Sequence, residues 1–69
     1  MATAVMAWSE AAQGRGGDEY LAHYVSAVDD DNEPVGKRYT CSSRDGAIAL
    51  GVKLASSLGM EFLNETDRD

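Results

Sequence analysis

The most informative segment for the fold is SSRDGAIALGVKLASSLG, residues 42–59. It predicts one helix, and the segments on either side of it predict the strands. Ser42 with Asp45 three residues later resembles a capping box, the pattern with which many helices begin. At 100° per residue, the apolar side chains that follow fill one broad arc, and the polar ones lie opposite. Gly59 supplies the left-handed position at which helices commonly end. We therefore expect an amphipathic helix that buries one face against another layer.

Two stretches before this helix alternate in the way that strands do. Residues 20–28 are rich in Tyr, Val and Leu, and residues 35–41 alternate around Lys37 and Tyr39. Residues 29–34 between them are polar and end in a proline, so we expect a hairpin with a loop longer than two residues. Both faces of the first strand carry apolar side chains, so either face can meet the core.

The two ends of the chain complete the expected sheet. Residues 1–12 fit a strand better than a helix, although disorder remains an alternative for residues 1–18, and a strand would place Ala4, Met6 and Trp8 on one face. Three glycines at 14, 16 and 17 then form a connector. Residues 60–63 return as a last strand.

These elements predict a single domain, residues 1–69, with residues 1–2 and 64–69 frayed. The expected class is α+β, in the order β-β-β-α-β: a small antiparallel sheet of three to four strands with one helix packed on one face.

Composition narrows the classes of partner. The chain has 69 residues with twelve acidic and six basic side chains, a net charge of −6. The negative electrostatic field of such a chain repels phosphate backbones and attracts basic surfaces. We therefore expect a basic protein surface as partner and no direct contact with nucleic acid. No apolar run approaches the roughly 20 residues of a membrane span, and no signal peptide opens the chain, so we expect a cytoplasmic protein.

An acidic run at the expected hairpin loop begins like a calcium loop. The match then fails, because Pro34 stands where that loop needs glycine and Thr40 where it needs glutamate, so we expect no metal site. The run is either a solvated loop or, together with two earlier acids, a contact patch near one end of the sheet. The acidic candidates for partner binding are Asp18, Glu19, Asp29, Asp30, Asp31 and Glu33.

For two further groups of side chains, the sequence allows either packing in the core or contact with a partner. Tyr20 and Tyr24 either pack in the core or stay exposed as partner anchors on the second face of the sheet, since Tyr is enriched in interface hot spots. Ile48 and Val52 lie at one margin of a helix arc that is wider than one sheet contact requires. Either the sheet or the N-terminal segment covers these two side chains, or a homodimer buries the apolar surface that the sheet leaves uncovered.

Catalysis has little support in the sequence. His23, Cys41, Ser42 and Ser43 include the residue types of nucleophilic catalysis, but no spacing places a nucleophile within reach of a base. The glycine connector lacks the lysine and the helix of a phosphate-binding loop. We expect no enzyme and no cofactor.

One resemblance adds to these expectations. The stretches Val-Gly-Lys-Arg-Tyr-Thr at 35–40 and Ser-Arg-Asp-Gly-Ala at 43–47, followed by the Ala-rich helix and a closing strand, are similar to small phage-encoded anti-CRISPR proteins that block type I complexes. The likeness covers roughly residues 3–63 and is mainly one of architecture. It implies stoichiometric binding, in the bacterial host cell, to a subunit of the CRISPR type I surveillance complex. The alternative is an antitoxin-like or other regulatory protein-binding module.

Overall fold

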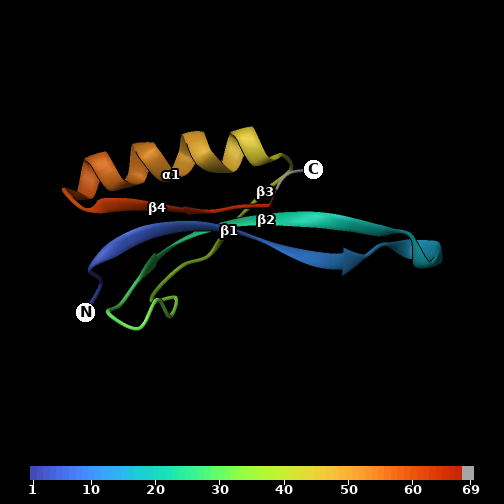
Figure 1. Ribbon diagram of the computed structural model, residues 1–69, viewed down its shortest axis with the longest axis horizontal. Helices are drawn as coiled ribbons and strands as arrows, with labels where there is room; N and C mark the ends of the chain where they lie inside the picture. The colour runs from blue at the N-terminus through green and yellow to red at the C-terminus, as the bar shows by residue number, and fades with distance from the viewer. Residues whose placement is uncertain (68–69) are drawn as a thin grey trace.

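The computed structural model describes residues 1–67 and has one helix and four strands in the expected β-β-β-α-β order, so the α+β class is confirmed (Figure 1). A 3₁₀ turn, η1, separates the first two strands. The elements are β1 (Ala4–Gln13), η1 (Arg15–Gly17), β2 (Glu19–Val28), β3 (Tyr39–Cys41), α1 (Arg44–Leu58) and β4 (Glu61–Glu65).

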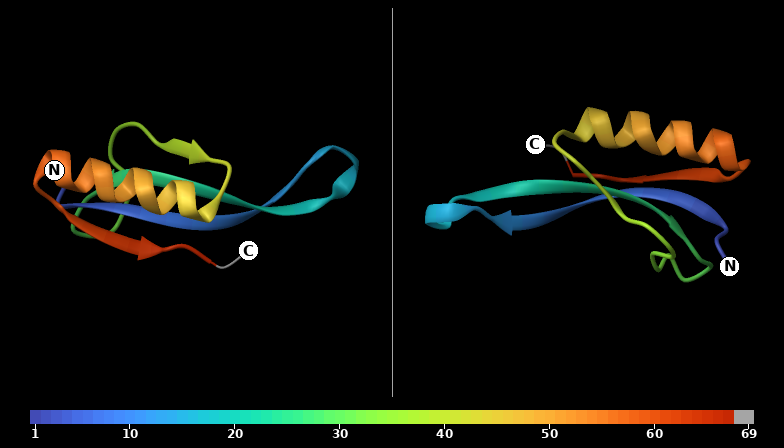
Figure 2. Two further views of the ribbon diagram at one scale, coloured as in Figure 1. Left: turned by 90° about the horizontal axis from the view of Figure 1, so that it is seen from above. Right: turned by 180° about the vertical axis from the view of Figure 1, so that it is seen from behind.

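The sheet is mixed, with the order β3-β2-β1-β4, and the expectation of an antiparallel sheet is wrong at β4. β1 pairs with β2 and β2 with β3 in antiparallel fashion, whereas β4 lies parallel to β1. The two edge strands, β3 and β4, therefore run in the same direction. Parallel strands need a long crossover connection. Here α1 provides it by passing over one face of the sheet from one edge to the other (Figure 2).

The helix begins one residue later than the capping pattern predicted. Ser43, not Ser42, is the N-cap, because its hydroxyl oxygen accepts a hydrogen bond of 3.0 Å from the backbone N–H of Gly46. The predicted end is confirmed: Gly59 adopts the left-handed conformation at φ 66°, and its N–H reaches the carbonyls of Ala55 and Ser56.

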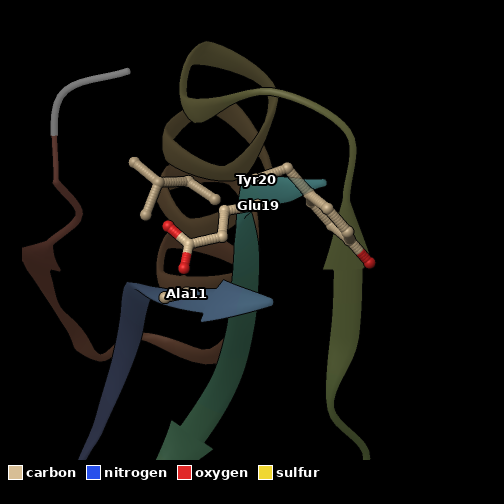
Figure 3. Close-up of a pocket in the computed structure, with 4 residues that line it drawn as sticks. Ala11, Glu19 and Tyr20 are labelled. Carbon is tan, nitrogen blue, oxygen red and sulfur yellow. The ribbon is translucent and has the colours of Figure 1, made fainter. Parts of the chain in front are cut away.

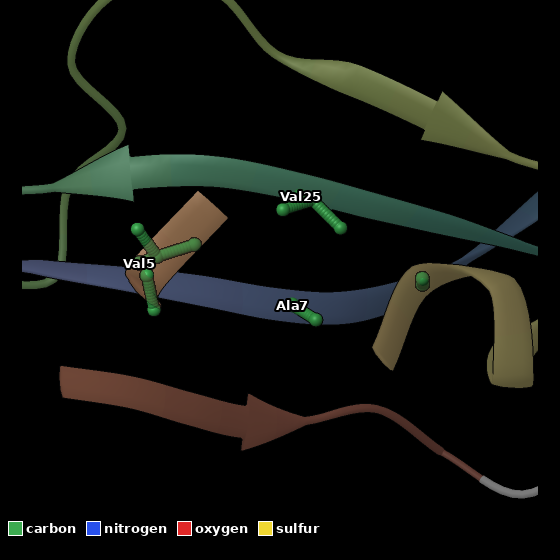
Figure 4. Packing of buried hydrophobic residues seen from close by; sticks show 5 residues of the cluster. Val5, Ala7 and Val25 are labelled. Carbon is green, nitrogen blue, oxygen red and sulfur yellow. The ribbon is translucent and has the colours of Figure 1, made fainter. Parts of the chain in front are cut away.

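The core lies between α1 and the covered face of the sheet, and its central side chains are small. Val5, Ala7 and Val25 from the two central strands are fully buried beneath the helix (Figure 4). On the helix, the buried residues Ala47, Gly51 and Ala55 recur every four positions. This row of small residues lets the helix axis approach the sheet closely. The half-buried aromatic rings of Tyr39 and Phe62 pack around the buried cluster.

The β1–β2 hairpin extends well beyond the layer that the helix covers. β4 pairs with β1 only along Ala4–Trp8, and β3 pairs with β2 only along His23–Val25. Within the described residues, the outer halves of β1 and β2 therefore pair only with each other, and they form a protruding ribbon (Figures 1 and 2). The molecule is accordingly elongated, 41 Å in its longest dimension and 17 Å in its shortest.

Two predicted boundaries differ from the structure. The strand expected at 35–41 is reduced to β3, because Gly36 turns the backbone at φ 82°. Ahead of this turn the chain makes only an isolated bridge between Pro34 and Val28, with a hydrogen bond from Val35 N–H to the Ala27 carbonyl. The tail expected to fray at 64–69 begins in β4, and Thr66 accepts a hydrogen bond from Arg44. Residues 68–69 of that prediction lie outside the described residues.

Candidate protein-binding surface

The strand register assigns every side chain of the sheet to one of two faces, because cross-strand partners lie on the same face. Val5, Ala7 and Val25 lie on the helix-covered face. Their neighbours along the strands lie on the opposite face, which we call the open face. One row of partners crosses all four strands on the open face: Glu65, Trp8, Tyr24 and Thr40. The next row contains Leu63, Met6 and Ser26.

An aromatic pair occupies the centre of the open face. The rings of Trp8 and Tyr24 lie 5.7 Å apart between centroids, at an interplanar angle of 36°. The Arg38 guanidinium lies 4.4 Å from the Tyr24 ring centroid, within cation–π distance. The Trp8 indole N–H donates a 2.9 Å hydrogen bond to the Glu10 carboxylate. Both rings are half-buried, so each presents apolar surface and a polar tip to a partner.

The two predicted tyrosine anchors lie on this face but at different distances from its centre. Tyr24 forms part of the aromatic pair, whereas Tyr20 lies farther along the hairpin and is 54% exposed. Trp8 was not among the predicted contact residues. The available signal was the alternation that puts Ala4, Met6 and Trp8 together, but the pairing of β1 with β2, which places Trp8 beside Tyr24, is a tertiary fact.

The six predicted acidic residues do not form one cluster. Asp18 and Glu19 precede and begin β2, while the run from Asp29 follows its last residue, so the ten-residue length of the strand separates the two groups. At about 3.4 Å per residue that distance is roughly 30 Å. The expectation that all six lie near one end of the sheet is therefore wrong.

The acidic loop is ordered by one of its own carboxylates. Oδ1 of Asp29 accepts hydrogen bonds from the backbone N–H of Asp31 at 2.9 Å and of Glu33 at 3.0 Å. Asn32 adopts the left-handed conformation at φ 60°, which asparagine tolerates better than most residues. The side chains of Asp30 and Asp31 remain exposed beside this turn.

The loop that follows β2 lies on the open-face side of the sheet, opposite α1 (Figure 1). Seven of the twelve acidic residues of the sequence therefore share that side, three from the strands and four from the loop. They are Glu10, Glu61, Glu65, Asp29, Asp30, Asp31 and Glu33. Arg38 lies among them, whereas Lys37 turns to the Tyr39 ring on the other face. The open-face side is thus an apolar and aromatic centre surrounded by carboxylates.

The helix margin that was considered for self-association remains partly uncovered. Ile48 is half-buried, and Val52 is 52% exposed on the outer surface of α1. Self-association through these two residues stays a prediction.

One histidine pairing was missed by the sequence analysis. His23 is 1% exposed, and its Nδ1 lies 2.7 Å from the hydroxyl of Ser9, which also accepts a hydrogen bond from the Asp67 N–H. Cys41 lies opposite His23 in the sheet and packs against the core. The Ser9 hydroxyl thus links the residues after β4, through Asp67, to His23 on the neighbouring central strand. Over residues 1–67, no group of three or more His, Cys, Asp or Glu side chains is placed to hold a metal ion.

Two hollows adjoin the start of β2, where the hairpin leaves the layered part of the molecule. The first is lined by Ala11, Glu19, Tyr20 and Leu21 (Figure 3). The second, of about 480 Å³, lies at the edge of β2 beyond β3. Its lining residues are Tyr20, Leu21, Ala22, Tyr24, Thr40, Cys41 and Ser42.

Within the described part of the chain, α1 is too short and too polar to cross a membrane. Comparison with known proteins finds no matching family model, no similar curated protein and no similar solved structure. A function for this chain therefore has to be argued from its surfaces.

Proposed function

We propose that this chain is a small acidic inhibitor that binds one-to-one to a basic surface of a bacterial nucleic-acid-binding complex, in the manner of an anti-CRISPR protein acting on a type I surveillance complex. It would act in the cytoplasm of the bacterial host cell. Surveillance complexes hold guide RNA and DNA in positively charged channels, so an anionic protein can compete for the same surface. The binding would be non-catalytic.

The observation that carries the proposal is the composition of the open-face side. Its seven carboxylates supply a negative field that steers association with a basic surface. Charge alone steers association but contributes little binding energy. The half-buried Trp8–Tyr24 pair adds an aromatic centre of the kind that dominates binding energy in protein interfaces. A merely solvated acidic loop would not need that centre beside it.

The first test separates the open-face side from overall charge. The variant Asp30→Asn with Asp31→Asn removes two carboxylates that make none of the loop's hydrogen bonds described above. The matched control is Asp45→Asn with Asp67→Asn, which removes one charge from the first turn of α1 and one from the segment after β4 whose backbone bonds to Ser9 on the helix-side face. At low salt we expect the first pair to slow association with the target complex about tenfold and the control to change it less than about twofold. Equal effects of the two pairs would contradict the proposal.

The second test addresses the aromatic centre. Trp8→Ala should weaken the complex by about 30-fold or more, the loss typical of a hot-spot aromatic residue. Leu58→Ala, at a side chain of α1 that is 54% exposed, should leave affinity unchanged, and circular dichroism should verify the fold of both variants. The biological readout is phage plaque formation on CRISPR-active bacteria that express the chain. Unchanged immunity across type I systems would remove the anti-CRISPR part of the proposal.

A further inference from the structure

The edge of β2 beyond β3 has unpaired backbone groups whose positions follow from the hairpin register. The N–H of Gly14 donates to the carbonyl of Asp18 at 2.8 Å, which makes these two residues a hydrogen-bonded pair. In an antiparallel ladder such pairs alternate with non-hydrogen-bonded ones. By the β1–β2 register, the backbone N–H and C=O groups of Tyr20 therefore point toward β1. Those of Glu19 and Leu21 point the other way, to the outer edge of β2.

The same alternation of inward and outward backbone groups holds at the other end of β2. Ala27, which the count also assigns to the outward set, accepts a hydrogen bond from Val35 N–H at 2.9 Å. Outward residues His23 and Val25 are the partners of β3. β3 ends at Cys41, opposite His23, because the chain turns there into the helix cap at Ser43. Among residues 1–67, no strand therefore lies beside the next outward groups, those of Leu21 and Glu19.

A hollow beside this vacant edge and the carboxylate of Glu19 on it indicate what kind of segment can bind there. The 480 Å³ hollow lies beside it and opens between Tyr20 and Leu21 of β2 and Cys41 at the end of β3. Glu19 and Leu21 lie on the helix-side face and Tyr20 and Ala22 on the open face. The Glu19 carboxylate and the Tyr20 ring point in different directions from the start of β2 (Figure 3). An added strand would place one set of side chains next to a carboxylate and the other next to an aromatic ring.

We infer that this edge accepts an extended basic peptide segment of the partner as a fifth strand, antiparallel to β2 and in line with β3. Backbone groups of Glu19 and Leu21 hold the segment, as in other complexes formed by strand addition. A lysine or arginine opposite Glu19 makes the cross-strand charge pair, and an apolar side chain on the other face packs against Tyr20. The inference rests on the proposed function for the positive charge of the partner.

A synthetic hexapeptide that alternates lysine and valine is the probe for this site. We expect saturable binding to the full chain by fluorescence anisotropy, with new protection of the Leu21 amide in hydrogen exchange. Leu21→Pro removes one outward N–H, a change that edge strands tolerate, and should weaken binding at least about tenfold. Ala11→Pro is the matched control, since Ala11 is the cross-strand partner of Leu21 and lies on the other edge of the same ribbon.

Several results would overturn the inference. They are equal weakening by Ala11→Pro, equal binding of a control hexapeptide that alternates glutamate and valine, or protection from exchange confined to β4. A peptide-free dimer that Leu21→Pro dissociates would show that a second copy is the occupant. If Leu21→Pro does not fold, N-methylation of the peptide's lysines tests the same hydrogen bonds, because the residues opposite Glu19 and Leu21 direct their N–H groups at β2. Unchanged affinity would refute strand addition.

The two proposals fail separately. Inhibition of the bacterial complex by the Leu21→Pro chain, without peptide binding, would refute the edge site and leave the inhibitor function standing. Peptide binding with the expected variant pattern but without any restored plaque formation would leave the edge site standing and refute the anti-CRISPR proposal.

Discussion

Gly51→Ala is the substitution for which the structure makes the sharpest prediction. Gly51 is buried in the middle of α1, where it faces the ring of Phe62 on β4. A Cβ at this position would lie 2.9 Å from Cδ1 and 3.0 Å from Cζ of that ring, and closer still to Cε1. Real Cβ atoms essentially never approach so closely. The ring or the helix would have to move.

Two opposing terms set the size of the effect. Alanine is favoured over glycine in a helix interior by about 1 kcal/mol. Overpacking a close contact costs about 1–3 kcal/mol. The net change in the free energy of unfolding is therefore a loss of about 0–2 kcal/mol, and 1 kcal/mol corresponds to about 4–8 °C in Tm for a domain of this size. At the exposed helix position 49, where no ring intervenes, Ala49→Gly should cost about 1 kcal/mol from propensity alone.

A double-mutant cycle with Phe62→Leu isolates the contact. Without the ring, Gly51→Ala should stabilise the protein by about 1 kcal/mol, so the coupling between the two positions should be about 1–3 kcal/mol. Urea denaturation of the four chains measures it. Stabilisation by Gly51→Ala in the presence of Phe62, or a coupling below about 0.5 kcal/mol, would refute the close approach of helix and β4.

Three further predictions concern side-chain hydrogen bonds. Ser43→Ala should cost about 1 kcal/mol in urea denaturation because it removes the helix cap, and an equal cost for Ser42→Ala would contradict the assignment of the cap. Ser9→Ala should cost about 1–3 kcal/mol, since buried His23 loses a hydrogen-bond partner, and a Tm change of less than about 2 °C would contradict this role. Asp29→Ala should accelerate amide exchange in the acidic loop, whereas Asp29→Asn, which keeps an acceptor oxygen, should not; equal acceleration would show that the charge orders the loop.

The candidate surface was only partly accessible to sequence reasoning. Tyr24 and the acidic run were identified by residue type, and both lie on the open-face side. Trp8 was not selected, because its partner Tyr24 is sixteen positions away and only the strand register brings the rings to 5.7 Å. Asp18 and Glu19 were expected with the acidic loop near one end of the sheet. An extended strand separates them in space.

Local patterns indicated most of the elements of this protein: alternation for β2, the apolar arc for α1, and Gly59 for its end. They misplaced the helix cap by one residue and made β3 too long. These signals are short-range, because they depend on the periods of helix and strand and on the backbone freedom of glycine. Strand direction and register are long-range. The parallel pairing of β4 depends on where the α1 crossover returns the chain, the pairing of Ser9 with His23 on the β1–β2 register, and the vacant edge of β2 on where β3 ends. Nothing in the residues of any one segment encodes them, and tertiary packing alone decides them.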